Sequence, residues 1–405
     1  MRSARALPAA LGGLIALAAA IGIGRFVYTP ILPPMIEALG MSKAAAGLIA
    51  SANFLGYLLG ALLAAWPNLP GSPRTWLLVS LAVSAVTTAG MGTAQTMAPF
   101  LLLRFIGGGA SAVVLVLASA MVLEKLAEAR RPGLSALHFA GVGTGIAASA
   151  ILVAGLLRAD QNWRSLWFAS GAVSLLATVA VALLLRDARV PAQQAGGDGG
   201  PRPAIEAALP RLIAAYGLFG FGYVITATFI VAIVRATPAV RASEPMVWIV
   251  FGVAAAPSVA LWTRIAERLG ILASFAVACA IEAGGVLASV TWRSATGIFL
   301  ATTLVGGTFM GLTALGLVGA RALAAGDSRR VLAWMTAAFG LGQIIGPTFA
   351  GVVSDRLGSF TVPSIAAAGA LLLAAGLVLS QPRPRPGSAA TGEDRPMPPG
   401  GSPDS

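Results

Sequence analysis

The same pattern of apolar runs and glycines occurs twice along this chain, at an offset of 199 residues. The residues of the first copy that recur in the second are Phe100, Gly107, Gly108, Arg131, Gly141 and Gly143, and their counterparts are Phe299, Gly306, Gly307, Arg330, Gly340 and Gly342. Near the start of each copy, Gly22 and Gly24 match Gly220 and Gly222, one residue off this register. The chain is therefore built from two homologous halves.

Both halves are too apolar for a soluble fold. Hydrophobic residues make up 57% of the 405 residues and charged residues only 10%, whereas soluble domains contain about 25% charged residues. A helix of about 20 apolar residues spans a bilayer. Runs of that length lie near residues 11–38, 45–66, 75–96, 98–123, 132–157, 163–185, 207–234, 246–266, 270–291, 295–320, 331–354 and 361–380. The sequence predicts an all-α membrane protein with twelve transmembrane helices in two pseudo-symmetric six-helix bundles.

The polar segments divide the chain into four parts. We expect an N-terminal six-helix bundle over 1–186 and a C-terminal six-helix bundle over 207–380. We expect residues 187–206 to form a cytoplasmic linker and residues 381–405 to form a disordered cytoplasmic tail. Their Gly, Pro and polar residues cannot bury a core.

The basic residues predict the orientation of these spans. With both termini in the cytoplasm, 18 of the 27 Lys and Arg residues lie on the cytoplasmic side or in cytoplasmic loops, and only seven lie outside. This asymmetry fits the positive-inside rule for a multi-pass protein of the cytoplasmic (inner) membrane. The basic residues are scattered through short loops, which indicates contact with membrane lipid and argues against a nucleic-acid partner. We expect a monomer.

Two arginines lie inside the expected spans. Internal duplication of a membrane unit is the usual build of a secondary transporter, whose substrate binds between the repeats. Arg25 lies near the middle of the first span and Arg104 in the outer part of the fourth. Because guanidinium groups bind carboxylates and phosphates in a bidentate way, both are candidates to bind an anionic substrate. Alternatively, they satisfy backbone carbonyls at broken helix ends.

Two other ionisable residues are candidates for proton coupling. His138, in the fifth span, has a reference pKa of about 6.5, and its counterpart in the second half is Ala337. Glu282 is the only carboxylate in the middle of a span, and burial disfavours the ionised form of such an acid. The alternatives are structural hydrogen bonding for His138 and a peripheral position for Glu282.

Polar and aromatic residues near these charges complete the candidate substrate site, namely Tyr28, Asn53, Tyr57, Tyr223 and Gln343. Polar contact between helices is their alternative role. Prolines within the expected spans predict helix breaks and candidate bends, at Pro30, Pro33, Pro34, Pro257 and Pro347.

Several functional classes lack their motifs in this sequence. Neither lysine, Lys43 or Lys125, lies in a phosphate-binding loop, so ATP is not the expected energy source. A single histidine and a single cysteine exclude paired-histidine and thiolate metal sites. No nucleophile motif of a serine hydrolase occurs. We expect no enzyme activity, no metal and no cofactor.

Particular stretches resemble the YbfB/YjiJ-type branch of the major facilitator superfamily, above all Gly22–Met35 (GIGRFVYTPILPPM) and Ser51–Leu62 (SANFLGYLLGAL). His138–Ser149, Gly220–Phe229 and Gly340–Pro347 are similar to that branch too. The resemblance implies a major-facilitator-type fold and alternating access by rocking of the two bundles. It implies no particular substrate.

Together these features predict a secondary active transporter that moves a small organic solute with proton coupling. The excess of buried positive charge favours an anionic solute. Two alternatives stay open, an uncoupled facilitative carrier and a non-transporting membrane sensor or scaffold.

Overall fold

The computed structural model describes residues 6–66, 70–185, 203–324 and 328–380, and all regular elements in these ranges are helical. The first half contains α1 (Ala6–Leu17), η2 (Ala18–Ile23), α2 (Tyr28–Leu39), α3 (Lys43–Ala64), α4 (Pro73–Gly90), α5 (Met97–Glu128), η3 (Pro132–Leu134), α6 (Ser135–Arg158) and α7 (Trp163–Leu184). The second half contains α8 (Pro203–Arg235), η4 (Pro238–Ser243), α9 (Glu244–Ala255), α10 (Ser258–Leu269), α11 (Ile271–Thr291), α12 (Ala295–Leu323), α13 (Ser328–Leu357) and α14 (Thr361–Leu379). Most of the expected linker (187–202) and the expected tail (381–405) lie outside the described residues.

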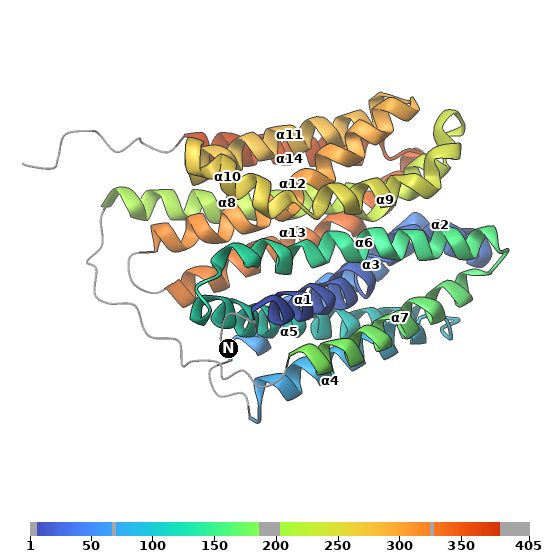
Figure 1. Cartoon of the computed structure of the whole chain (residues 1–405). Coiled ribbons are helices and arrows are strands. Elements are labelled where there is room, and N and C mark those ends of the chain that lie inside the picture. Colours follow the sequence, from blue (N-terminus) through green and yellow to red (C-terminus); the bar gives the residue numbers. More distant parts are fainter. Residues whose placement is uncertain (1–5, 67–69, 186–202, 325–327, 381–405) are drawn as a thin grey trace, which may run out of the picture.

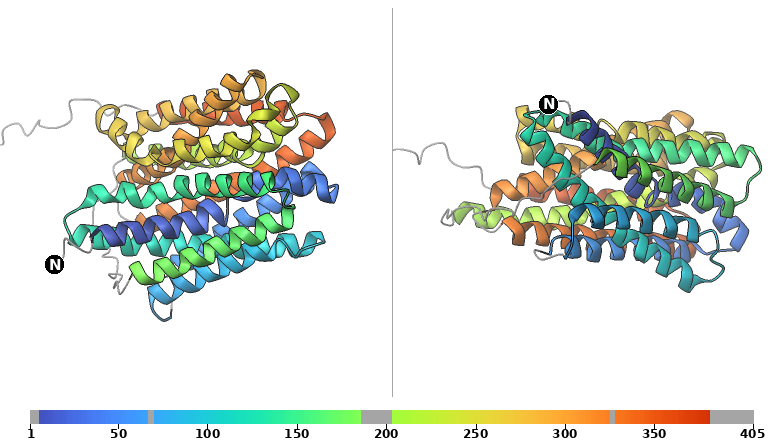
Figure 2. Two further views of the ribbon diagram at one scale, coloured as in Figure 1. Left: turned by 45° about the vertical axis from the view of Figure 1, so that its right-hand side comes forward. Right: turned by 60° about the horizontal axis from the view of Figure 1, so that its bottom comes forward.

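The helices form two groups that follow the two halves of the sequence. Figure 1 shows the helices of the first half, in blue to green, beside those of the second half, in yellow to red. The long helices run in roughly one direction in both views of Figure 2. The two groups meet along α3 with α13 and along α6 with α9. The all-α fold with two bundles, as predicted from the duplication, is confirmed.

The number of membrane-spanning helices is close to the predicted twelve. Ten helical segments of the described chain are long and apolar enough to cross a bilayer, and the bent pair of η4–α9 and α10 raises this to eleven. The expected span near 75–96 corresponds to α4, which is 18 residues long and carries the charged Arg74 in its first turn. Twelve spans therefore stay a prediction.

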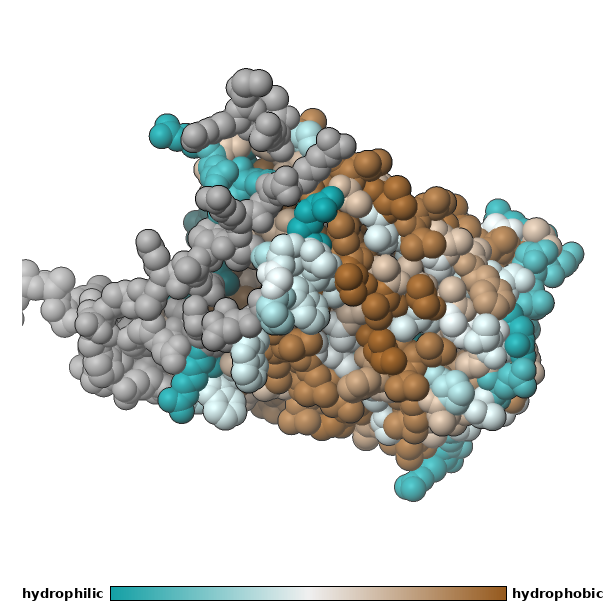
Figure 3. Space-filling view, turned by 90° about the horizontal axis from the view of Figure 1, so that it is seen from below, coloured by the Kyte–Doolittle hydropathy of each residue, from teal (hydrophilic) through white to brown (hydrophobic). Residues whose placement is uncertain are grey.

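The outer surface of the bundle carries the apolar side chains that a bilayer requires. On the face in Figure 3, a brown band of hydrophobic residues lies between teal, hydrophilic ends. Leu176 on α7 is 71% exposed and Val86 on α4 is 64% exposed. Such exposure is unfavourable in water but favourable against lipid chains, so these helix faces are the lipid-facing surface.

The first span, Ala6–Leu39, is broken next to Arg25. Pro30 lacks the backbone N–H that would bond to the carbonyl of Phe26, and its ring crowds that carbonyl. The backbone responds upstream with π-type bonds, from Gly24 N to Ala19 O (2.8 Å) and from Phe26 N to Ile21 O (3.1 Å). The predicted break is therefore present, but it precedes the prolines by one helical turn.

The other expected breaks differ from each other. Pro257 lies between α9 and α10, which are bent by 45°, so a break at this proline is confirmed. Pro347 lies inside the continuous helix α13, as Pro33 and Pro34 lie inside α2. At these three positions the prediction of a break was wrong. Helices in membrane proteins tolerate such prolines where neighbouring helices cover the freed carbonyl groups.

Glycines allow α3 and α5 to pack backbone against backbone. A Cβ atom at Gly56 would collide with the carbonyl oxygen of Phe105, and one at Gly60 would collide with that of Gly109. Small residues are the usual means of such close helix approach in membranes, where the hydrophobic effect adds little.

Replacing Gly56 by alanine is expected to destabilise the protein by about 1–3 kcal/mol, the usual cost of overpacking. The control is Gly376→Ala on α14, where an added Cβ meets no atom within 4 Å. Unfolding in detergent mixtures, followed by circular dichroism, measures both variants. Equal stability of the two variants would contradict the close packing of α3 on α5.

The two halves are joined by polar contacts toward one end of the molecule. Hydrogen bonds and ion pairs from the first half to the second include those of Thr29, Glu37, Lys43 and Ser51. Ser51 Oγ donates to Ile344 O (2.6 Å), and Thr29 Oγ1 donates to Ala227 O (2.8 Å). Asp355 accepts from the backbone N–H groups of Lys43 (3.0 Å) and Ala44 (2.8 Å). This end of the interface is therefore closed.

Candidate functional site

Arg25 lies at the break between η2 and α2, and only 5% of it is exposed. Its guanidinium carbon lies 4.2 Å from the ring centroid of Tyr57, 4.5 Å from that of Phe54 and 5.3 Å from that of Phe26. Its Nε and Nη2 atoms have no hydrogen-bond partner, and none of the described carboxylates forms an ion pair with it. A buried cation without a counterion is strongly unfavourable, so this position attracts an anion.

Arg104 on α5 binds the broken segment of the first span. Its Nη1 donates to the carbonyl oxygen of Gly24 (3.1 Å), and its Nη2 donates to that of Arg25 (3.0 Å). The break leaves these two carbonyls without their usual helical donors, so Arg104 replaces the missing bonds. The two guanidinium groups are close enough to repel each other. This geometry is the structural alternative that the sequence left open, and a substrate contact by Arg104 stays a prediction.

Tyr28 and Asn53 support the same break from within the first half. The ring of Tyr28 lies 5.0 Å from the guanidinium carbon of Arg104, and its hydroxyl donates to Ala46 O (2.8 Å). Asn53 donates through Nδ2 to Arg104 O (2.9 Å), while its Oδ1 has no partner. Both residues position the arginines, and only Asn53 keeps a free polar atom.

Tyr223 and Gln343 form the corresponding polar pair in the second half. Gln343 Nε2 donates to the hydroxyl of Tyr223, and its Oε1 has no partner although the residue is fully buried. The ring of Tyr223 stacks near Phe309 and Phe339, at centroid distances of 5.6 and 5.8 Å. The second half thus contributes an aromatic wall with one buried amide.

The two groups of residues meet at the seam between the halves. Phe26 lies 6.0 Å from Phe309, centroid to centroid, across that seam. Tyr223 is close enough to Arg25 and Tyr57 to interact with both electrostatically. The cation of the first half therefore faces the aromatic wall of the second half.

Glu282 on α11 is fully buried inside the second half. Neither carboxyl oxygen has a hydrogen-bond partner, and the nearby hydroxyl of Thr308 donates to the carbonyls of Leu304 and Val305 instead. The carboxyl group is close enough to Tyr223 to interact with it electrostatically. Glu282 is therefore enclosed within the second half and does not face lipid.

His138 on α6 is fully buried within the first half. Its Nε2 shares a hydrogen bond with Ser119 Oγ (3.0 Å), and its ring packs beside Phe139 and against the backbone of Gly13. All of these neighbours belong to the first half. The geometry matches the structural alternative for His138, and its role in proton coupling stays untested.

Sequence reasoning missed the aromatic neighbours of the site. Phe54 and Tyr57 are three residues apart and share one face of α3, a spacing that links Phe54 to a predicted site residue. Phe309 and Phe339 carry no such local signal, because they approach Tyr223 only through the packing of α8, α12 and α13. Nowhere in the described ranges do three or more His, Cys, Asp or Glu side chains gather as metal ligands.

Comparison with known proteins agrees with this architecture. A family model described as "Uncharacterised MFS-type transporter YbfB" matches residues 17–379. The sequence matches no curated protein. The fold is similar to that of the nucleoside transporter NupG, with a TM-score of 0.67 and 15% identity over 93% of this chain and 98% of that one. A bacterial homologue of the human lysosomal transporter Spinster, in an inward-facing and unoccupied conformation, gives a TM-score of 0.65 and 15% identity over 93% and 94%.

At 15% identity the two solved structures support the fold alone. The family match covers nearly all of the described chain and confirms the resemblance found in the sequence. The chain thus belongs to the family of YbfB-type MFS transporters, and it is a multi-pass membrane transport protein.

Proposed function

We propose that this protein is a secondary active transporter that moves a small organic anion by alternating access, coupled to protons. One observation supports an anionic substrate. Arg25 is buried at the seam of the halves with two unpaired guanidinium nitrogens, and no ion pair with a described carboxylate compensates its charge. Binding of a carboxylate or phosphate there would supply the missing charge and hydrogen bonds.

The residues around Arg25 suit the rest of such a solute. Phe26, Phe54 and Tyr57 surround the guanidinium group, and Tyr223 with Gln343 faces it from the second half. Aromatic faces bind the apolar part of a solute, and the free Oε1 of Gln343 accepts one hydrogen bond from it. Because the contacts come from both halves, their relative movement would expose the solute to each side in turn.

We assign proton coupling to Glu282 rather than to His138. Glu282 has two unpaired carboxyl oxygens close to Tyr223, whose hydroxyl is bonded to Gln343. Protonation of this acid would therefore change the charge beside the aromatic wall. His138 has its structural partners within the first half.

Glu282→Gln is expected to abolish solute accumulation driven by a pH gradient while exchange of labelled for unlabelled solute continues. With one proton coupled per solute, one pH unit corresponds to about 1.4 kcal/mol and hence about tenfold accumulation. The control is His138→Gln, which keeps a hydrogen-bond partner for Ser119 and should accumulate solute normally. If His138→Gln loses accumulation and Glu282→Gln keeps it, His138 is the coupling residue and the assignment to Glu282 is wrong.

The orientation follows from the distribution of basic residues. We propose that both termini lie in the cytoplasm, so that the closed end with Lys43 and Arg235 faces outward. We propose twelve spans, a location in the cytoplasmic membrane with lipid around a monomer, and a division between the bundles at the segment before α8, which begins at Pro203 rather than after the expected 187–206.

Reconstitution in liposomes with an imposed pH gradient tests the transport proposal. The screen includes labelled organic anions. Nucleosides serve as the uncharged solutes, because the structurally similar NupG is named a nucleoside transporter. Flux that follows the gradient and prefers anions is expected. Flux of an anion that ignores the gradient would make the protein an uncoupled carrier. A complete lack of flux, with proper folding, would favour the sensor or scaffold.

A further inference from the structure

A cavity of about 330 Å³ lies between the two halves at the closed end of the interface. Its walls come from α2 and α6 of the first half and from α8, η4 and α9 of the second. The volume lies at the lower end of the range for small-ligand sites, which is roughly 300–1,000 Å³. The cavity is distinct from the Arg25 site, because neither Arg25 nor the rings around its guanidinium group line it. Phe26 and Trp248, 6.3 Å apart between centroids, lie between the two.

Three arginines and a single glutamate supply the charges of this cavity. Arg158 ends α6, Arg235 ends α8, and Arg241 lies in η4. These are three of the seven basic residues that the sequence places on the outer side, where lysine and arginine are normally depleted. Their concentration around one cavity is not explained by membrane topology.

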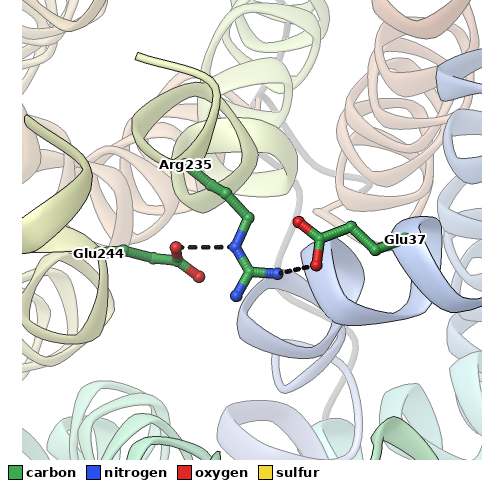
Figure 4. A network of polar contacts seen from close by, with 3 residues as sticks. All are labelled: Glu37, Arg235 and Glu244. Atoms are coloured by element: carbon green, nitrogen blue, oxygen red, sulfur yellow. Dashed lines mark hydrogen bonds and ion pairs between the residues drawn. The ribbon is translucent and has the colours of Figure 1, made fainter. Parts of the chain in front are cut away.

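Only one of the three arginines is neutralised. Arg235 donates through Nε to Glu244 (2.8 Å) and pairs through Nη1 with Glu37 (3.2 Å), as Figure 4 shows. The side chains of Arg158 and Arg241, both exposed, form no hydrogen bond or ion pair with any described residue. The cavity therefore has a surplus of positive charge with guanidinium donors available.

The uncharged lining favours a ligand that also has an apolar part. Pro30, Val153, Leu157 and Val231 line the cavity together with Trp248. Trp248 is 1% exposed, and its indole Nε1 has no hydrogen-bond partner. Because Nε1 is enclosed by the protein, Trp248 contributes an apolar part of the wall and no donor to a ligand.

We infer that this cavity binds an amphipathic anion, a phosphate or carboxylate group joined to a small apolar group. The anionic group is held by Arg158 and Arg241, and the apolar group packs against Trp248 and the aliphatic wall. A soluble organic anion and the headgroup region of an anionic lipid share this chemistry. Because both halves line the cavity, binding would stabilise the conformation in which this end is closed.

Binding can be measured without any transport, so the test is independent of the proposed function. The test uses purified full-length protein with the substitution Arg25→Gln, which disables the central candidate site. This protein is titrated with phenyl phosphate, and benzyl alcohol serves as the uncharged control. In a second arm, the same protein in phosphatidylcholine nanodiscs with and without phosphatidylglycerol is analysed by native mass spectrometry for retained lipid.

The variants Arg158→Gln and Arg241→Gln are combined, and Arg293→Gln is the control. Arg293 is an exposed arginine expected on the same side, outside the cavity lining. We expect the double variant to bind phenyl phosphate about tenfold more weakly, as the loss of two exposed charge contacts predicts. The control should bind as its parent does.

Each result decides the inference. Arginine-dependent binding of phenyl phosphate supports the site with a soluble ligand, and arginine-dependent retention of phosphatidylglycerol supports it with a lipid. Binding that benzyl alcohol reproduces, or that survives the double variant, overturns it. Lack of binding by both anionic probes overturns it as well, whatever the outcome of the transport assay.

Discussion

Arg25→Gln is expected to lower kcat/KM for transport of an anionic solute by about 10- to 150-fold while the protein becomes no less stable. A hydrogen bond to a charged group contributes about 1.5–3 kcal/mol, which corresponds to that range. Arg25 has no ion pair with a described residue and leaves two nitrogens unpaired. Removing it relieves a buried charge in the empty protein, which offsets the loss of its contacts with the three aromatic rings, and costs the contact with substrate.

Uptake into liposomes and thermal unfolding measure the two effects on the same preparation. Arg25→Lys serves as the matched control, because it keeps the charge but loses the bidentate geometry, and should retain intermediate activity. Wild-type uptake by Arg25→Gln would overturn the binding assignment. A large loss of stability would mean that the guanidinium group is a structural element of the break.

Gly143→Ala is expected to shift the protein away from the conformation described here. Gly143 on α6 touches the backbone of α9, where an added Cβ would collide with the backbone nitrogen of Ala256. The contact joins the two halves, so strain there can be relieved by separating them without unfolding either one. Overpacking costs about 1–3 kcal/mol, which changes the ratio of the two conformations by roughly 5- to 150-fold.

Spin labels at Gln161 and Arg293, which are exposed residues in loops of the first and second half, report the separation at the closed end. The distance between labels should increase in Gly143→Ala and stay unchanged in Gly155→Ala. Gly155 lies on the same helix, and a Cβ there meets no atom within 4 Å. An unchanged distance in both variants would show that contact of α6 with α9 does not control closure.

The duplication and the lengths of the apolar runs were enough to predict the two bundles, because lipid restricts a chain to few folds. The position of the first break was less predictable. Pro30 suggested a break at the proline, whereas the chain deviates one turn earlier, where the carbonyl of Phe26 is crowded. The sequence thus identifies the proline that causes the break, but it places the break one helical turn too far along the chain.

The candidate site was predictable in its charges and less so in its partners. Arg25 and Glu282 stand out in the sequence because ionisable residues are rare in spans. The sequence could not distinguish Arg104, which binds two backbone carbonyls, from Arg25, which has free donors. That difference arises from the direction of each side chain across a helix break, which depends on tertiary packing.

The hydrogen bonds of Arg104 to the carbonyls of Gly24 and Arg25 have a mechanical consequence. They hold the interrupted helical segment that carries Arg25 against α5, so this cation would move with its own bundle if the bundles rock as we propose. Phe309 and Phe339 would then move with the opposite bundle. A solute that contacts both bundles would keep its acidic group on Arg25 while its apolar part moves across the rings of Phe309 and Phe339. The size and planarity of that apolar part should therefore limit which solutes are transported.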